Sequence, residues 1–222
     1  MTKSEARARI EQIGIIPGIR LSTAERARFA AEAVYRAGIP IAEITMTVPG
    51  ALDVISDLSV RYPDLVVGAG TVLDADTAAR AIDAGARFLT STGLVHEVVE
   101  LALRKEVLVF PGATTPTEVI AAWKTGADFV KVFPCGPLGG PSYIRTLKQP
   151  FPKLALIATG GVNQLTAASF ILAGATALGI GRELTNPEYL PQLREEQIHE
   201  LARRFLALVK SARDQQQGVV TP

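Results

Sequence analysis

One lysine lies in the middle of an apolar segment, where a charged group is costly. The segment GADFVKVFP (126–134) places Lys131 between Val130 and Val132. Lysine is rarely fully buried unless its charge is paired, because removing an ammonium group from water costs free energy. Burial favours the neutral amine, which is a nucleophile toward carbonyl compounds. In the alternative interpretation, only the aliphatic stem is buried and the ammonium group reaches solvent at the end of the strand.

A carboxylate occupies a similar position in another apolar segment. Glu43 lies within IAEITM (41–46), and Thr45 and Thr47 follow at a spacing of two, so the three share one face of a strand. The structural interpretation is an ion pair between Glu43 and Lys131, although a buried ion pair is weak evidence for stability. The functional interpretation makes Lys131 a Schiff-base nucleophile and Glu43 the acid and base that moves protons around the imine. The functional interpretation is favoured if both side chains point into the same interior.

Eight short apolar segments recur along the chain and predict the strands that must position these groups. They are residues 13–19, 41–46, 65–70, 88–92, 107–112, 129–134, 154–160 and 177–181. Ala-rich segments with helical spacing lie between them, such as 23–38 and 74–85. Nearly continuous apolar strands of this kind are typical of a parallel sheet buried on both faces. Four joints, AGIP, AGAR, TGAD and AGAT, place a glycine where a helix is expected to end.

Eight strand–helix units fit a closed (β/α)8 TIM barrel better than an open doubly wound sheet, which is the alternative. Helical segments at about 187–192 and 194–212 are expected to pack outside the barrel as an extra C-terminal helix. The residues from about 213 resemble a frayed tail. No linker or low-complexity segment divides the chain, so the sequence predicts a single domain over residues 1–222.

The composition argues against several classes of protein. The chain has 222 residues and a net charge of +1, which gives no electrostatic footprint for nucleic acid or an anionic membrane. One cysteine and two histidines argue against a disulfide framework and a Cys/His metal site. The segment MTKSEARARIEQIG lacks the apolar core of a secretory signal, and no uncharged run is long enough to span a bilayer. We therefore expect a soluble cytoplasmic protein that uses no metal or other cofactor.

Several polar residues follow the predicted strands at the end of the barrel where chemistry takes place. Arg20 follows the first strand, Thr71 the third and Arg182 the eighth, while Gly160 and Gly161 in TGGVN follow the seventh. A glycine turn that leads into a helix presents N–H groups to an anion, and arginine binds carboxylates and phosphates bidentately. Each feature also has a structural interpretation, because Gly-Gly turns close tight connections and arginines commonly lie at surfaces.

Six segments in one order and spacing resemble the KDPG/KHG aldolases: EITMTVPGA, VVGAGTVLD, FPGATTPTE, FVKVFP, GGPSYIRTLKQPFP and IATGGVN. The resemblance extends from about residue 10 to about residue 210. These are class I aldolases that cleave 2-dehydro-3-deoxy-6-phosphogluconate (KDPG) or 4-hydroxy-2-oxoglutarate (KHG) to pyruvate and an aldehyde. The resemblance implies a (β/α)8 barrel without a metal, which is usually a homotrimer.

The resemblance also implies roles for individual residues. Lys131 matches the Schiff-base lysine of the family and Glu43 its catalytic glutamate. Thr71 matches a threonine that contacts substrate, and Arg20 matches an arginine that many members use to hold the pyruvyl carboxylate. The turn at Gly160 and Gly161 matches the turn that binds phosphate.

Three positions depart from the family pattern. Some members have arginine where this chain has Thr47, and many have proline where it has Thr92. The serine that commonly binds phosphate after the eighth strand is replaced by Arg182, which could hold a phosphate or a carboxylate or block the pocket. Two further functions stay open: a phosphosugar isomerase or epimerase in which Lys131 is only electrostatic, and a non-catalytic anion-binding scaffold.

Overall fold

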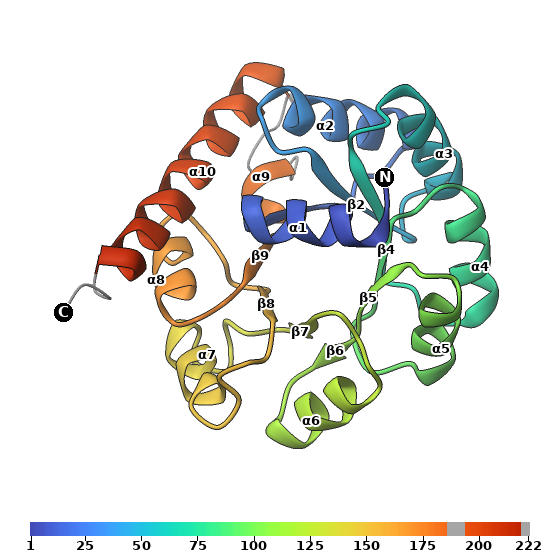
Figure 1. The fold of residues 1–222 in the computed structure, drawn as a ribbon. Helices are drawn as coiled ribbons and strands as arrows, with labels where there is room; N and C mark the ends of the chain where they lie inside the picture. The colour runs from blue at the N-terminus through green and yellow to red at the C-terminus, as the bar shows by residue number, and fades with distance from the viewer. Residues whose placement is uncertain (186–193, 219–222) are drawn as a thin grey trace.

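The computed structural model describes residues 1–185 and 194–218, and its centre is one parallel sheet (Figure 1). The strand order is β5-β4-β3-β2-β1-β9-β8-β7-β6. The strands are β1 (Ile15–Ile19), β2 (Ile41–Thr45), β3 (Val66–Gly70), β4 (Phe88–Thr90), β5 (Leu108–Phe110), β6 (Gly112–Ala113), β7 (Val130–Val132), β8 (Leu156–Thr159) and β9 (Ala177–Ile180). The two ends of this order, β5 and β6, are separated only by Pro111, so the sheet closes into a ring. The predicted (β/α)8 barrel is therefore confirmed, and the open sheet is not formed.

Pro111 divides the fifth strand because proline has no N–H group to donate to the sheet. Its carbonyl still accepts a hydrogen bond from the N–H of Lys131 at 2.9 Å. The carbonyls of Val109 and Ala113, two residues away on either side, also accept from the segment that contains β7. On the side that faces Lys131, β5 and β6 therefore behave as one continuous strand.

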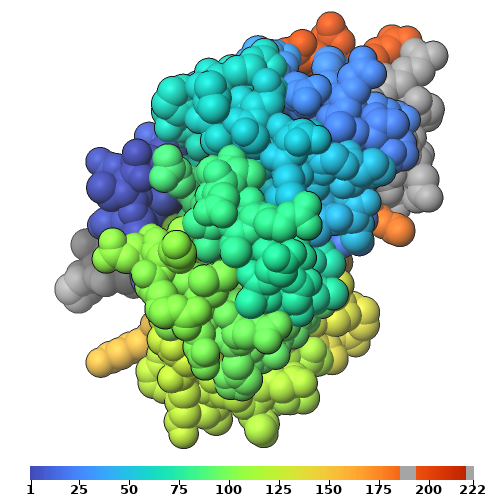
Figure 2. Space-filling model, turned by 90° about the vertical axis from the view of Figure 1, so that its right-hand side faces the viewer, coloured from blue at the N-terminus to red at the C-terminus, as the bar shows by residue number. Residues whose placement is uncertain are grey.

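Helices alternate with the strands and surround the ring. They are α2 (Ala24–Arg36), α3 (Ala51–Arg61), α4 (Ala75–Asp83), α5 (His96–Arg104), α6 (Pro116–Lys124), α7 (Pro141–Lys148), α8 (Ala167–Leu172) and α9 (Arg182–Thr185). Figure 2 shows one side of the molecule, where the chain from α3 to α6 forms a continuous surface. Each glycine of the four predicted joints adopts a positive φ, between 84° and 104°, which is the conformation expected after a helix.

Aromatic side chains fill part of the barrel interior. The rings of Phe88 and Phe110 stack at 5.2 Å, and Phe129 meets Phe110 edge-on at 4.9 Å. All three side chains are fully buried. A Cβ at Gly68 would lie 2.5 Å from the Phe88 ring, so the missing side chain at Gly68 makes room for it. The barrel is therefore a packed core rather than a pore.

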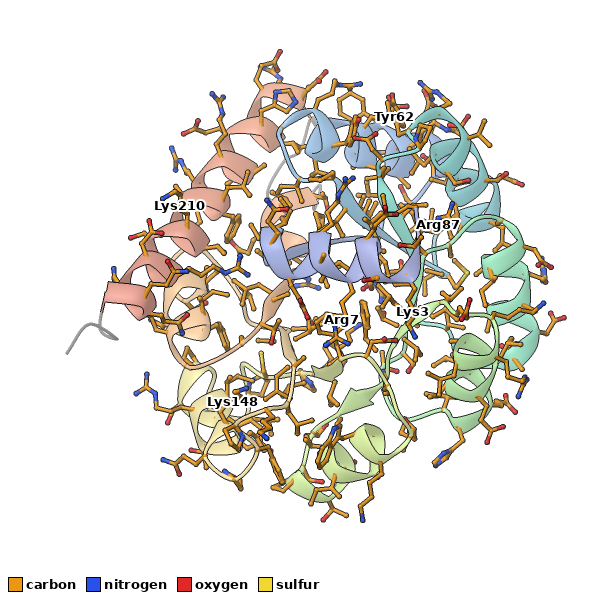
Figure 3. All side chains as sticks on the ribbon, viewed as in Figure 1. Lys3, Arg7, Tyr62, Arg87, Lys148 and Lys210 are labelled. Atoms are coloured by element: carbon orange, nitrogen blue, oxygen red, sulfur yellow. The ribbon has the colours of Figure 1, made fainter. Side chains whose placement is uncertain are left out.

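A helix that the sequence interpretation did not include covers one end of the barrel. This helix, α1 (Lys3–Ile13), crosses the end that faces the viewer in Figure 1 and contacts β5 and β9. Lys3 and Arg7 project from α1 (Figure 3), and their charged groups lie 3.0 and 3.9 Å from the carboxylate of Asp128. Because Asp128 precedes β7, α1 closes the N-terminal end of the strands and leaves the opposite end for chemistry.

The expected frayed tail from residue 213 is helical instead, since α10 (Glu195–Gly218) continues to Gly218. Two side chains explain the difference. Arg213 donates hydrogen bonds to the carbonyls of Glu11, Gln12 and Thr176, and Gln216 donates to the carbonyl of Ile171. These contacts fix the end of α10 against α1 and the barrel. The predicted helical segment at 187–192 lies outside the described residues.

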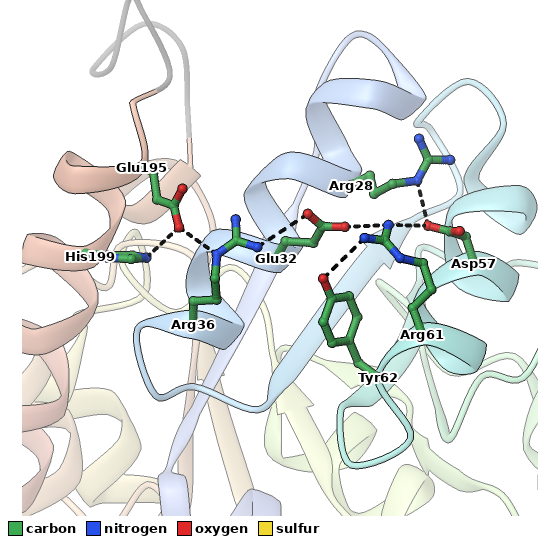
Figure 4. A network of polar contacts seen from close by, with 8 residues as sticks. All are labelled: Arg28, Glu32, Arg36, Asp57, Arg61, Tyr62, Glu195 and His199. Carbon is green, nitrogen blue, oxygen red and sulfur yellow. Dashed lines mark hydrogen bonds and ion pairs between the residues drawn. The ribbon is translucent and has the colours of Figure 1, made fainter.

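Ion pairs join the start of α10 to α2 and α3 (Figure 4). Glu195 accepts from Arg36 at 2.6 Å, and Glu32 lies 2.7 Å from Arg61. Single ion pairs at a surface contribute about 0–1 kcal/mol each, so their main effect is to fix how the three helices sit together. Within the described ranges, no helix is both long and apolar enough to cross a bilayer.

Candidate active site

Lys131 and Glu43 meet inside the barrel. Lys131 is on β7 and Glu43 on β2, which lie four strands apart around the ring of eight. Their side chains nevertheless converge, with Lys131 Nζ 3.8 Å from Glu43 Oε1. Only 7% of Lys131 and 8% of Glu43 is exposed, so the lysine head does not extend into solvent. The condition that favoured a catalytic pair, two charged groups in one interior, is met.

The glycines of β3 leave the space that the Glu43 side chain occupies. In register, Glu43 pairs with Gly68 of β3, and Gly70 lies two residues further along the same strand. A Cβ at Gly70 would lie 2.2 Å from Glu43 Oε1, which is closer than any non-bonded contact allows. The segment VVGAG therefore forms a strand whose missing side chains leave room for the carboxylate.

A third polar residue, Thr90, contacts the lysine. Thr90 ends β4 and is 1% exposed, and its Oγ1 accepts a hydrogen bond from Lys131 Nζ at 3.2 Å. Of this strand end, the sequence interpretation considered only Thr92, which is exposed; the intervening Ser91 donates its hydroxyl to the carbonyl of Gly93. Thr90 is a polar residue in a buried strand, as Lys131 and Glu43 are, but a threonine there is not conspicuous in the sequence because threonine is common in strands.

Arg20 and Thr71 form a second pair at the C-terminal ends of β1 and β3. Arg20 Nη2 donates to Thr71 Oγ1 at 3.1 Å, and Arg20 is exposed. Thr71 has a φ of 60°, a conformation that β-branched residues rarely adopt. Backbone strain of this kind persists where the surroundings impose it, and it is common at ligand sites. The structure thus brings together two residues that the sequence proposed separately.

The turn at Gly160 and Gly161 has the open geometry of an anion site but does not start a helix. Both residues have positive φ, 83° and 95°, and no described residue accepts a hydrogen bond from either N–H group. The expected helix start directly after the turn is wrong, because α8 begins only at Ala167. Asn163 accounts for the delay, since its side-chain oxygen accepts from the N–H groups of Leu165 and Thr166 and forms a turn.

Arg182 follows the neighbouring strand. It is the first residue of α9 and is exposed, and within residues 1–185 and 194–218 its guanidinium has no hydrogen-bond or ion-pair partner. Because Thr159 of β8 is in register with Gly179 of β9, Arg182 and the glycine turn follow adjacent strand ends. Within the described residues, both groups have hydrogen-bond donors without an acceptor.

The other end of the barrel has a surface hollow. This hollow of about 470 Å³ is lined by residues that include Lys148 and Arg213. Burial lowers the pKa of both groups, but each is engaged: Lys148 Nζ donates to the carbonyls of Pro152 and Leu154. This hollow is remote from Glu43 and Lys131.

Within the described part of the chain, no three His, Cys, Asp or Glu side chains gather as metal ligands.

Comparison with known proteins agrees with this geometry. The model of the family described as KDPG and KHG aldolase matches residues 6–201. A 2-dehydro-3-deoxy-phosphogluconate aldolase of Pseudomonas aeruginosa is 36% identical over 64% of this chain and 64% of its own length. The enzyme of the same name from Treponema pallidum is 32% identical over 73% of this chain and 77% of its own.

One solved structure shows the chemistry in a similar barrel. The KDPG aldolase of Legionella pneumophila, with pyruvate captured as a covalent carbinolamine, superimposes with a TM-score of 0.80. It is 27% identical, and the match covers 89% of this chain and 96% of that protein.

Proposed function

The chain belongs to the family of KDPG and KHG aldolases, and from this premise we propose that Lys131 is the nucleophile with which it forms its covalent intermediate. The protein is a carbon–carbon lyase, a class I aldolase that cleaves a 2-oxo-4-hydroxy acid to pyruvate and an aldehyde. The observation that carries the assignment is the contact between Lys131 and Glu43 inside a closed apolar barrel. A phosphosugar isomerase in which Lys131 is only electrostatic would form no covalent adduct with pyruvate and borohydride, which distinguishes it from this aldolase.

The reaction follows from the positions of these groups. The neutral amine of Lys131 attacks C2 of the 2-oxo acid, and the resulting carbinolamine loses water to form an iminium. The iminium accepts electrons from the breaking C3–C4 bond while the C4 hydroxyl loses its proton. Glu43, directly or through one water, takes this proton and later protonates the enamine carbon. Hydrolysis of the iminium then releases pyruvate and restores Lys131.

Two anion sites at the C-terminal end of the barrel orient the substrate in this proposal. Arg20, held by Thr71, binds the carboxylate next to the reacting carbonyl. The N–H groups of Gly160 and Gly161, with Arg182, bind an anionic group at the far end. A cleavage assay that compares phosphorylated and unphosphorylated 2-oxo-4-hydroxy acids tests which far-end group is accepted. Absence of pyruvate release from any of them would contradict the proposed function.

Replacing Arg182 by serine tests the site at the far end. We expect Arg182→Ser to weaken binding of a substrate that ends in phosphate or carboxylate by roughly 10- to 150-fold, because a lost hydrogen bond to a charged group costs about 1.5–3 kcal/mol. Pyruvate has no far-end anion, so its imine should form to the same extent as in the wild type. The measurements are the KM for cleavage and the yield of pyruvate trapped by borohydride.

A matched control for this variant is available on the opposite end of the barrel. Arg87 is also exposed and precedes β4 (Figure 3), so Arg87→Ser makes the same change far from the site and should leave both values unaltered. Equal losses for pyruvate and the full substrate in Arg182→Ser would indicate a structural arginine. No loss for either would place the far-end anion elsewhere.

We also propose that the protein assembles as a homotrimer and acts in the cytoplasm, as the resemblance to this family of metabolic enzymes implies. Apolar side chains on the outside are compatible with assembly: Leu165 is 91% and Trp123 is 51% exposed. Light scattering on the purified protein should give about three times the mass of the 23.6 kDa chain. A monomer at the concentrations used for activity assays would contradict the proposal.

A further inference from the structure

When the iminium forms, the lysine nitrogen loses two hydrogens and keeps one. Counted from the ammonium–carboxylate pair, the reaction converts R–NH₃⁺ and a C2 carbonyl into R–NH⁺=C and water. The nitrogen lone pair forms the C–N bond, and the C2–O bond breaks with its electrons going to the oxygen. Two of the three hydrogens on nitrogen leave with that oxygen as water, and the third stays on the iminium nitrogen. No other reactant is needed.

Two polar groups of the described chain lie next to this nitrogen, and their distances differ. Thr90 Oγ1 is within hydrogen-bonding distance of Nζ at 3.2 Å, whereas Glu43 Oε1 is at 3.8 Å. A carboxylate can take a proton from nitrogen and deliver it to the departing oxygen. A threonine hydroxyl does not take a proton near neutral pH, but it accepts a hydrogen bond without moving the hydrogen.

From this difference we propose that Thr90 is a third catalytic residue, which holds the one hydrogen that remains on the Lys131 nitrogen from amine to iminium. Glu43 then carries the two hydrogens that leave. With one N–H fixed toward Thr90 on the wall at β4, the nitrogen presents its lone pair to the interior where the carbonyl arrives. The proposal depends on the assignment of Lys131 as the imine-forming lysine.

The barrel wall supports this arrangement. Thr90 is 1% exposed and its main-chain carbonyl accepts from the N–H of Val72, so the residue is fixed on both its backbone and its side chain. No described residue accepts a hydrogen bond from the Thr90 hydroxyl, so the contact with Lys131 is the only one its side chain makes through hydrogen bonding. A hydroxyl placed only to satisfy the core would be expected to bond a backbone carbonyl, as Thr45 Oγ1 does with Ile19.

The test compares Thr90→Val, which keeps the shape and removes the acceptor, with Thr90→Ser, which keeps the acceptor and removes a methyl group. In Thr90→Val we expect the rate of pyruvate trapping by borohydride and the kcat for cleavage to fall about tenfold, the equivalent of about 1.4 kcal/mol. The KM should remain near the wild-type value, because the hydroxyl contacts the reacting nitrogen rather than the bound substrate. Thr90→Ser should recover most of the rate.

A second buried threonine provides the matched control. Thr185 is 2% exposed and its hydroxyl donates to the carbonyl of Gly181, so Thr185→Val should trap pyruvate at the wild-type rate. Trapping by Thr90→Val within twofold of the wild type would overturn the proposal, and so would a serine variant as slow as the valine variant. If the wild type itself forms no adduct with pyruvate, the assignment of Lys131 as the imine-forming lysine is wrong. If the wild type forms the adduct and Thr90→Val forms it equally fast, only the proposal for Thr90 is wrong.

Discussion

Replacing Lys131 by arginine is expected to abolish both cleavage and covalent trapping of pyruvate. A guanidinium remains protonated at any working pH and has no lone pair to attack a carbonyl. The positive charge beside Glu43 is retained, so any activity that required only an electrostatic lysine would survive this change. Incubation with pyruvate and borohydride, followed by mass spectrometry of peptides, should show one adduct in the wild type, on the peptide that contains Lys131, and none in Lys131→Arg.

Two other lysines make this experiment discriminating. Lys148 is a real competitor, because its burial lowers its pKa and thereby favours the nucleophilic form. Its nitrogen is held by two carbonyls at the opposite end of the barrel, so we expect no adduct there. Lys124 on α6 is exposed, and Lys124→Arg is the matched control that should keep full trapping. An adduct on Lys148 or Lys124, or trapping that persists in Lys131→Arg, would falsify the assignment.

Replacing Glu43 by glutamine should leave the fold intact and reduce turnover by about 10²- to 10⁴-fold, the usual contribution of a general acid–base group. The amide fills the same space next to Gly70 but cannot accept a proton from the C4 hydroxyl. Trapping of pyruvate should persist at a reduced rate, because Lys131 is still present while its proton acceptor is lost. The measurements are kcat for cleavage and the rate of adduct formation on the same protein sample.

A matched carboxylate is available on the surface for comparison. Glu97 on α5 is exposed, and Glu97→Gln should turn over at the wild-type rate with the same change in net charge. Thermal unfolding of Glu43→Gln should show a cooperative transition, which distinguishes lost chemistry from lost structure. A Glu43→Gln enzyme with near wild-type kcat would transfer the proton-moving role to another group.

Most of the barrel could be predicted because its signals are local. Apolar segments of strand length and the glycine after each helix depend only on neighbours in the sequence, and all eight predicted strands are present. The helix α1 also carries a local signal, a capping box in which Thr2 and Glu5 bond each other's backbone N–H groups. The sequence interpretation used that segment only to argue against a secretory signal. Its docking is not local, since Arg213 reaches carbonyls 201 and 202 positions away.

The candidate site likewise contains residues with a local signal in the sequence and residues without one. Lys131 and Glu43 could be found from sequence because a charge in an apolar strand is conspicuous whatever surrounds it. Thr90 was missed because threonine is common in strands and becomes informative only when its distance to Nζ is known. The position of α8 was misjudged for a similar reason, since the turn made by Asn163 competes with the helix for the same backbone N–H groups.

The continuous fifth strand, formed by β5 and β6, reduces how much the enzyme must reorganise when it reacts. Proline fixes the φ angle of the wall at Pro111, and the carbonyl of that residue holds the backbone of Lys131 at 2.9 Å. The proposed nucleophile thus lies on a part of the chain that has already lost its conformational freedom during folding. Ordering that has been completed in advance does not add to the activation barrier. Because the fifth strand is already rigid, the group that must still be ordered at each turnover is the incoming oxo acid.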